Sequence, residues 1–334
     1  MIEPPDLPVE TIVARVRRRY GLVVVDATFL PVGNDSSAWS FRLDGSDQRW
    51  FLKVFGRRVE PAAIEVPRFL ATMGVDHLVP AIPTAGGESF DTGSPFSFVL
   101  FPFVDAAPGG EIGLTEANRV ELGRFLRHVH ETTPDDHLGA MLRHERFDVR
   151  DQAYIEQVGS ELGEADPPDA IGVALLERWE RQRDDIAHTL RRAQELATYG
   201  RSAPRELVIC HADFHAWNVL IEPSGAFHVV DWDEVEFAPR ERDLMFVSGD
   251  VADIDPTGEH FYAGYGEVSI DPALLAYYRY DWVLQELADY HRRVFDASLG
   301  EQTRAKALDS FVELFGPEDV VAAAYRADAA IPLG

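Results

Sequence analysis

Cysteine and lysine are the residues that this sequence of 334 residues uses least. The single cysteine, Cys210, excludes a disulfide within the chain, and its place in an apolar stretch predicts a core residue rather than a nucleophile. The basic residues are nearly all arginine, and lysine occurs only at positions 53 and 306. Because Lys53 lies inside an apolar, strand-like stretch, we interpret it as a residue with a chemical role that arginine does not fill.

Long apolar runs and basic patches are also missing. No run of eighteen apolar residues occurs, which predicts no membrane span, and the N-terminus lacks a basic segment followed by an apolar one, so we expect a cytoplasmic protein. The net charge of −26 argues against binding to nucleic acid or anionic membranes. It favours a cationic ligand or serves solubility, and nothing in the sequence implies a protein partner.

Alternating apolar residues in the first hundred positions predict a small, mainly antiparallel sheet with two helices. We expect helices over residues 9–20 and 61–72, and strands over 22–25, 27–32, 38–43, 50–55 and 96–101. From about residue 105 the pattern changes to long helices, including one capped by Thr115, one over 175–199 and one over 274–295.

The sequence therefore predicts an α+β, bilobal fold with a small antiparallel β-sheet lobe followed by a larger helical lobe. Residues 1–104 form the expected nucleotide-binding lobe and hinge, and residues 105–334 form the expected catalytic and acceptor-binding lobe. A cleft between two such lobes is the usual place for a ligand.

The richest motif is His211-x-Asp213-x4-Asn218, followed by Asp231 eighteen residues after Asp213. Apolar segments on both sides of a Pro-Ser-Gly turn at 223–225 predict a β-hairpin that brings these three oxygen-bearing side chains together. Phosphoryl transfer needs one carboxylate to accept a hydroxyl proton, and an amide and a second carboxylate to hold Mg²⁺. We predict that Asp213 is the base and that Asn218 and Asp231 are the metal ligands.

Three further segments predict a nucleotide site. Lys53 is expected to contact the phosphates and to pair with Glu65 on the 61–72 helix, with Glu60 as the alternative. The loop with Gly33, Asn34, Ser36 and Ser37 can direct N–H and hydroxyl groups toward an anion. In the hinge, the carbonyl of Pro102 and the N–H of Val104 suit the adenine edge.

These motifs, with Phe101-Pro-Phe-Val-Asp105, Asp231-Trp-Asp233 and Glu241-Arg-Asp243-Leu, resemble the aminoglycoside phosphotransferase family over nearly the whole chain. Within that family the chain is most similar to spectinomycin phosphotransferase-like antibiotic kinases. The resemblance implies a protein-kinase-like fold, ATP or GTP, Mg²⁺ and O-phosphorylation of a small-molecule antibiotic that confers resistance. It also implies that His130 and His211 are structural supports of the catalytic loop, and we expect Asp243 to open and cap a helix that braces it.

Acceptor binding is the least determined part of the prediction. A stripe along the 274–295 helix combines aromatic and polar side chains, which is typical of a core but also suits an ammonium-bearing sugar. The candidates are Asp233, Glu234, Tyr278, Asp281, Trp282, Gln285, Glu286 and Asp289.

Other functions stay open at this point. An uncharged nucleoside antibiotic, or a metabolite hydroxyl such as that of choline, homoserine or a sugar, is the alternative acceptor. A protein kinase is disfavoured because only seven residues separate Asp233 from Glu241, too few for a peptide-binding activation segment. An inactive binding module is disfavoured because Lys53, Asp213, Asn218 and Asp231 are all present.

Overall fold

The computed structural model describes residues 3–33, 35, 37–163, 167, 169–248 and 254–332. The chain forms two compact units, each built from two separate stretches of sequence. The first unit comprises residues 1–143 and 211–236, and the second comprises residues 144–210 and 237–334. These boundaries differ from the functional division predicted between residues 104 and 105, which stays a prediction.

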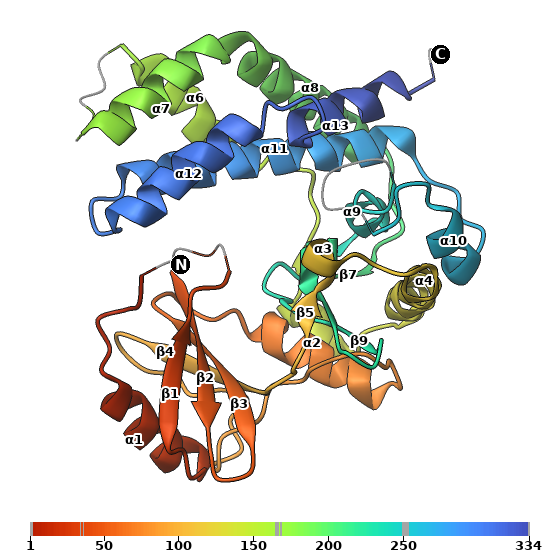
Figure 1. Cartoon of the computed structure of the whole chain (residues 1–334). Helices are drawn as coiled ribbons and strands as arrows, with labels where there is room; N and C mark the ends of the chain where they lie inside the picture. Colours follow the sequence, from red (N-terminus) through yellow and green to blue (C-terminus); the bar gives the residue numbers. More distant parts are fainter. Residues whose placement is uncertain are drawn as a thin grey trace. The chain divides into compact units, whose positions relative to one another are not determined.

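The first unit contains a four-stranded antiparallel sheet in the order β1 (Asp26–Leu30), β2 (Ala38–Asp44), β3 (Arg49–Phe55) and β4 (Ser97–Pro102) (Figure 1). Trp50, Leu52 and Val54 of β3 are buried in a core shared with α1 (Val9–Tyr20). Since successive side chains of a strand point to opposite faces, Lys53 lies on the other face of the sheet. That face packs against α2 (Pro61–Thr72).

A second sheet in the first unit has the order β5 (Ala107–Pro108), β8 (Val219–Ile221) and β9 (Phe227–Val229). Strands β8 and β9 form the predicted hairpin, with Gly225 at a φ of 88° in its turn. Thr115 is the N-cap of α4 (Glu116–Glu131), as the sequence predicted, and forms a capping box with Asn118. The remaining helices of this unit are α3 (Gly109–Ile112), α5 (Asp136–Met141) and the short 3₁₀ helix η1 (Ala216–Asn218).

The second unit is mainly helical. Its longest helix, α11 (Pro272–Phe295), contributes many buried side chains and contacts α8 (Arg183–Arg201), α12 (Glu301–Glu313) and α13 (Val320–Ala329) (Figure 1). The short strands β6 (Arg143–His144), β10 (Glu236–Ala238) and β7 (Val208–Cys210) form a three-stranded sheet at the ends of its sequence segments. Its helices are α6 (Gln152–Glu161), α7 (Ala170–Arg181), α8 (Arg183–Arg201), α9 (Glu241–Leu244), α10 (Glu259–Tyr265), α11, α12 (Glu301–Glu313) and α13 (Val320–Ala329). Within the described ranges, no helix has the length and apolarity needed to cross a bilayer.

Three predicted elements were wrong in detail. Residues 22–25 form no strand, although their alternation is real: Val24 is buried in the core, whereas Val23 and Val25 are 67% and 72% exposed. The helix predicted over 175–199 is two helices, because Gln182 leaves the helical region with φ −99° and ψ 11°. Asp243 does not cap a helix but lies fully buried inside α9, whose N-cap is Arg240.

Candidate active site

The loop between β7 and η1 is held by His211, whose side chain is completely buried. The Asp213 N–H donates to His211 Nδ1 at 3.3 Å, so the hydrogen of a neutral imidazole lies on Nε2. Nε2 lies 3.0 Å from the Val230 carbonyl and donates to it. His211 therefore ties the loop to the strand that precedes Asp231. Ala212 between them has a φ of 68°, a conformation that non-glycine residues rarely adopt outside functional turns.

Both carboxylate oxygens of Asp213 have neighbours within the same loop. Asn218 Nδ2 donates to Oδ2 at 2.8 Å and to the Asp213 carbonyl at 2.9 Å, which uses both hydrogens of the amide. His215 Nε2 lies 3.3 Å from Oδ1. It also lies 3.4 Å from Asn218 Nδ2, but that amide has no hydrogen left for it, so Nε2–H donates to Asp213. The sequence interpretation overlooked His215, although a histidine two residues after the base was the available signal.

Asn218 and Asp231 lie together at the open end of the β8–β9 hairpin. Val219 pairs with Val229, and the Val230 N–H donates to the Asn218 carbonyl at 3.0 Å, so the ladder continues one residue beyond the strands. Asp231 then takes a φ of 66°, which aspartate tolerates better than most residues and which turns the chain sharply. Because Nδ2 of Asn218 is engaged with Asp213, its Oδ1 is the atom suited to a cation. An amide oxygen and a carboxylate form a donor set that fits Mg²⁺.

Lys53 forms ion pairs with Asp231 and Asp233. Its Nζ lies 2.8 Å from Asp231 Oδ1 and 3.1 Å from Asp233 Oδ2, and only 15% of the side chain is exposed. Burial alone would lower the pKa of this ammonium, but the two carboxylates outweigh burial and raise it. Lys53 is therefore charged at neutral pH.

The predicted pairing of Lys53 with a glutamate of α2 was wrong for this structure. Glu65 accepts a hydrogen bond from the Ser89 hydroxyl and lies 3.8 Å from Arg68, and Glu60 is the exposed N-cap residue of α2. Glu65 thus contacts Ser89 and Arg68 and not Lys53. The lysine finds its carboxylates on the segment after β9 instead, 178 residues away in the sequence.

The loop between β1 and β2 is organised by Asp35. Its Oδ1 accepts from the Ser37 N–H at 2.7 Å and from the Ser37 hydroxyl at 2.6 Å, so in this structure both groups are bonded to Asp35, and their predicted contact with a phosphate stays a prediction. Gly33 has a φ of 84°, which meets the expectation of a left-handed residue. Burial disfavours the ionised form of Asp35, but Arg57 and the Ser37 hydrogen bonds outweigh it and lower its pKa. The candidates Asn34 and Ser36 lie outside the described residues.

The candidate hinge lies at the end of β4. Pro102 is the last residue of that strand, pairs with Trp50 and is exposed. The next residue, Phe103, donates its N–H to the Arg49 carbonyl at 3.3 Å, and Val104 follows without regular structure. Pro102 is thus exposed and Val104 is partly buried, while the predicted contact of their backbone with adenine stays a prediction.

The acceptor candidates fall into different environments. Tyr278 and Asp281 are buried at 1% and 3% exposure in the second unit, as core residues of α11 are. Asp281 accepts from the Arg150 N–H at 2.7 Å and from Gln285 at 2.9 Å. The other candidates are partly buried or paired: Trp282 stacks edge-on against Phe246, Asp289 pairs with Arg293, Glu286 is half-buried, and Glu234 lies 3.5 Å from Arg143.

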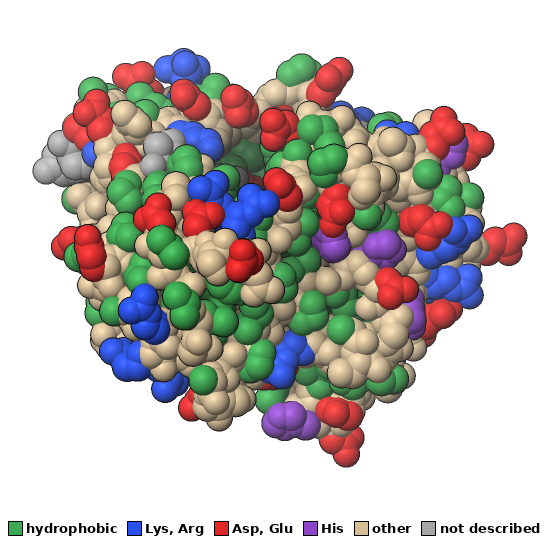
Figure 2. Space-filling model, turned by 60° about the horizontal axis from the view of Figure 1, so that its bottom comes forward, with side chains coloured by type: hydrophobic (Ala, Val, Ile, Leu, Met, Phe, Trp, Pro, Cys, Tyr) green, Lys and Arg blue, Asp and Glu red, His purple; other side chains and the backbone are tan. Residues whose placement is uncertain are grey.

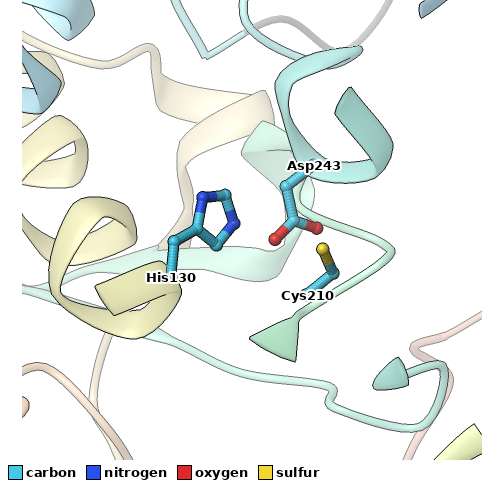
Figure 3. A group of neighbouring side chains, drawn as sticks. All are labelled: His130, Cys210 and Asp243. Carbon is cyan, nitrogen blue, oxygen red and sulfur yellow. The ribbon is translucent and has the colours of Figure 1, made fainter. Parts of the chain in front are cut away.

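Asp233 was predicted as an acceptor ligand, which stays a prediction; in this structure it pairs with two basic side chains. Its Oδ2 lies between Lys53 and Arg57, 2.8 Å from Arg57 Nη2. Within the second unit, Asp243 and Cys210 approach each other, with ligand atoms less than 4.8 Å apart (Figure 3). The same figure draws His130, which comes from α4. Cys210 is fully buried and donates to backbone carbonyls of Ala238 and Pro239 at 3.5 Å, which is the predicted core role.

The model of the phosphotransferase enzyme family matches residues 26–283 of this chain. The chain belongs to this family. This membership confirms the resemblance predicted from the motifs, and the protein is a phosphotransferase that acts on hydroxyl groups of small molecules.

Solved structures agree with this family membership. A structure of spectinomycin phosphotransferase APH(9)-Ia in complex with ADP and spectinomycin is 25% identical, with a TM-score of 0.86 over 97% of this chain and 99% of that one. Its AMP-bound complex is 25% identical, with a TM-score of 0.82 over 96% and 98% of the two chains. A microcompartment-associated aminopropanol kinase, 20% identical, shares the fold with a TM-score of 0.58 over 96% and 98%. None of the curated proteins matches the chain. The phosphotransferase therefore has the predicted α+β, kinase-like fold.

Proposed function

We propose that this phosphotransferase transfers the terminal phosphoryl group of ATP to a hydroxyl of a small-molecule antibiotic, an aminocyclitol of the spectinomycin type or an aminoglycoside. In a cell this reaction would confer resistance to the antibiotic. The observation that carries the proposal is the assembly of Lys53, Asp213, Asn218 and Asp231 in one compact unit. The likeness to a spectinomycin phosphotransferase over 97% of the chain supports the acceptor class.

Asp213 is the proposed base. Hydrogen bonds from Asn218 and His215 orient its carboxylate, and 34% of the side chain is exposed and accessible to an acceptor. A carboxylate held in this way can take the hydroxyl proton as the oxygen attacks phosphorus. Because transfer is direct and in line, Asp213 forms no covalent bond to the phosphoryl group.

Asn218 and Asp231 are the proposed ligands of Mg²⁺, which would neutralise phosphate charge when it is bound with the nucleotide. Lys53, whose ammonium is held charged, is the proposed phosphate contact. The backbone of Pro102 and Val104 is the proposed adenine contact, and GTP is an alternative donor. In this proposal residues 1–104 bind the nucleotide, and residues 105–334 supply the catalytic and acceptor-binding groups.

The decisive experiment measures ADP formation with a panel of aminocyclitols, aminoglycosides and nucleoside antibiotics, together with choline, homoserine and simple sugars. We expect turnover that depends on an aminocyclitol or aminoglycoside, with the phosphorylated product identified by mass spectrometry. Turnover only with an amino alcohol or a sugar would contradict the antibiotic acceptor and leave the kinase chemistry intact.

The metal role has its own test. Replacing Asp231 by Asn should abolish turnover while the protein stays folded, because an amide in place of the carboxylate removes a charged oxygen ligand. Circular dichroism provides the folding control. Full activity of Asp231→Asn, or of the wild type in excess chelator, would contradict the proposed metal site.

A further inference from the structure

Arg57 joins two segments of the candidate site that are far apart in the sequence. It lies four residues after Lys53, just beyond the end of β3. Its Nη2 lies 2.8 Å from Asp35 Oδ2 and 2.8 Å from Asp233 Oδ2, and its Nε donates to Asp35 at 3.0 Å. One guanidinium thus contacts both the β1–β2 loop and the segment that follows Asp231.

The charges of this cluster alternate along a chain of contacts. Asp231 contacts Lys53, Lys53 contacts Asp233, Asp233 contacts Arg57, and Arg57 contacts Asp35. Asp233 lies between the two cations, and both reach the same oxygen, Oδ2. The position of Asp233, and through it one of the two contacts of Lys53, therefore depends on Arg57.

Arg57 also acts on the loop through Asp35. That carboxylate holds the N–H and the hydroxyl of Ser37, and the Ser37 carbonyl accepts from the Gly56 N–H at 2.8 Å. The loop is thus fastened to the end of β3 by a backbone bond and by the guanidinium. A planar guanidinium with several donors can hold two carboxylates in fixed directions, whereas an ammonium acts as a point charge.

We propose that Arg57 is a positioning residue for nucleotide binding: by joining Asp35 to Asp233, it holds the β1–β2 loop and Lys53 in register for one set of phosphates. This inference rests on the proposed function. The alternative is that Arg57 forms an ordinary exposed ion pair with no role in nucleotide binding. Its side chain is 37% exposed, and exposed ion pairs contribute little to stability. An ordinary pair would leave nucleotide affinity unchanged.

The test is equilibrium binding of a fluorescent ATP analogue to the full chain, with and without Mg²⁺. We expect Arg57→Met to weaken binding about tenfold. Arg57→Lys should give an intermediate loss, because lysine keeps the charge but lacks the planar guanidinium that contacts two carboxylates. The matched control is Arg42→Met: Arg42 pairs with Asp44 on β2 at 3.1 Å and is 36% exposed, but its partner belongs to neither segment of the cluster. Arg42→Met should bind the nucleotide like the wild type.

A second variant tests the route through the loop. Asp35→Asn should weaken nucleotide binding by a similar factor. The double variant Asp35→Asn/Arg57→Met should bind the nucleotide as tightly as the two single variants do, because both substitutions remove the same connection. Fully additive losses would contradict a shared role. Thermal unfolding of each variant separates loss of affinity from loss of fold, and if Arg57→Met does not fold, Arg57→Lys and Asp35→Asn decide the question.

The outcomes separate this inference from the function on which it rests. A wild type that binds no nucleotide would overturn both. A wild type that binds nucleotide, with Arg57→Met and Asp35→Asn binding equally well, would overturn only the role of Arg57.

Discussion

At the scale of single residues, the environment of Asp213 shows how the local chain orients a carboxylate. The amide of Asn218 and the imidazole of His215 each contact one of its carboxylate oxygens. His211 binds the carbonyl of Val230, which follows β9, and so connects this loop to the hairpin. All four side chains come from the segment 211–218, so local geometry rather than long-range packing sets their arrangement. Such positioning is what the proposed role of Asp213 as a general base requires.

The first prediction concerns Asp213 as the proposed base. Replacing Asp213 by Ala should lower turnover by roughly a hundredfold or more, the usual range for the loss of a general base, with nucleotide binding nearly unchanged. Steady-state kinetics at saturating acceptor and a separate nucleotide titration measure the two effects. Turnover above a tenth of the wild-type rate would contradict the assignment.

The second prediction concerns His215. Its replacement by Ala removes the hydrogen bond to Asp213 Oδ1, and loss of one such bond, about 1 kcal/mol, should lower kcat several-fold to about tenfold without changing nucleotide affinity. The matched control is His228→Ala, since His228 pairs with Glu222 at 2.8 Å near the opposite, turn end of the same hairpin. Equal effects of the two variants would mean that His215 acts only through hairpin stability.

At the scale of elements, α11 combines a core role with buried ionisable groups. Asp281 is 3% exposed, and burial raises its pKa from 3.8 to about 6 despite the opposing effect of Arg150. Burial also lowers the pKa of His291, ten residues further on, to about 4. The helix therefore carries two groups whose protonation is coupled to folding in overlapping pH ranges but with opposite signs.

The third prediction follows from the raised pKa of Asp281. Between about pH 4 and pH 6 the folded state holds a proton on this carboxyl that the unfolded state releases, so raising the pH through this window destabilises the fold. The stability of the wild type relative to Asp281→Asn should therefore fall by about 3 kcal/mol across it and stay level above it. Using the difference between the two proteins cancels the contribution of His291.

Urea unfolding at a series of pH values measures this difference. Asp328→Asn is the matched control, because Arg192 lowers the pKa of Asp328 and its relative stability should stay level from pH 4 to pH 6. A level curve for Asp281→Asn as well would show that Asp281 ionises normally in the fold.

At the scale of the whole molecule, the dominant property is the net charge of −26. On the face drawn in Figure 2, acidic side chains are spread widely, with basic side chains between them, rather than gathered in one patch. At physiological ionic strength, salt screens the attraction of such dispersed charges beyond about 8 Å. A cationic acceptor would therefore be held by nearby carboxylates and not by the overall field.

The fourth prediction concerns salt. If the acceptor carries ammonium groups, its KM should rise with ionic strength while the nucleotide KM changes much less, and neutralising a contacting carboxylate should raise it about tenfold. Glu286→Gln and Asp289→Asn are the variants to compare. If the acceptor KM changes neither with salt nor with these substitutions, the net negative charge of the protein serves solubility. That result would favour an uncharged acceptor such as a nucleoside.

The sequence by itself determined the elements and motifs whose parts are close along the chain. The helices at Val9–Tyr20 and Pro61–Thr72 follow from local periodicity and from proline and glycine at their ends. The β8–β9 hairpin brings Asn218 beside Asp231 because strand pairing and one tight turn control its geometry. Local rules suffice for such features, since few alternative conformations satisfy them.

Only the tertiary structure decided which distant groups meet. Lys53 pairs with Asp231 and Asp233 rather than with Glu65, and Arg57 joins Asp35 to Asp233. Tyr278 and Asp281 are buried in α11, although their stripe was compatible with a pocket. The position of a charged or aromatic residue in the sequence does not determine which distant residue it contacts. Its partners depend on how strands and helices pack. That packing is a property of the folded chain as a whole.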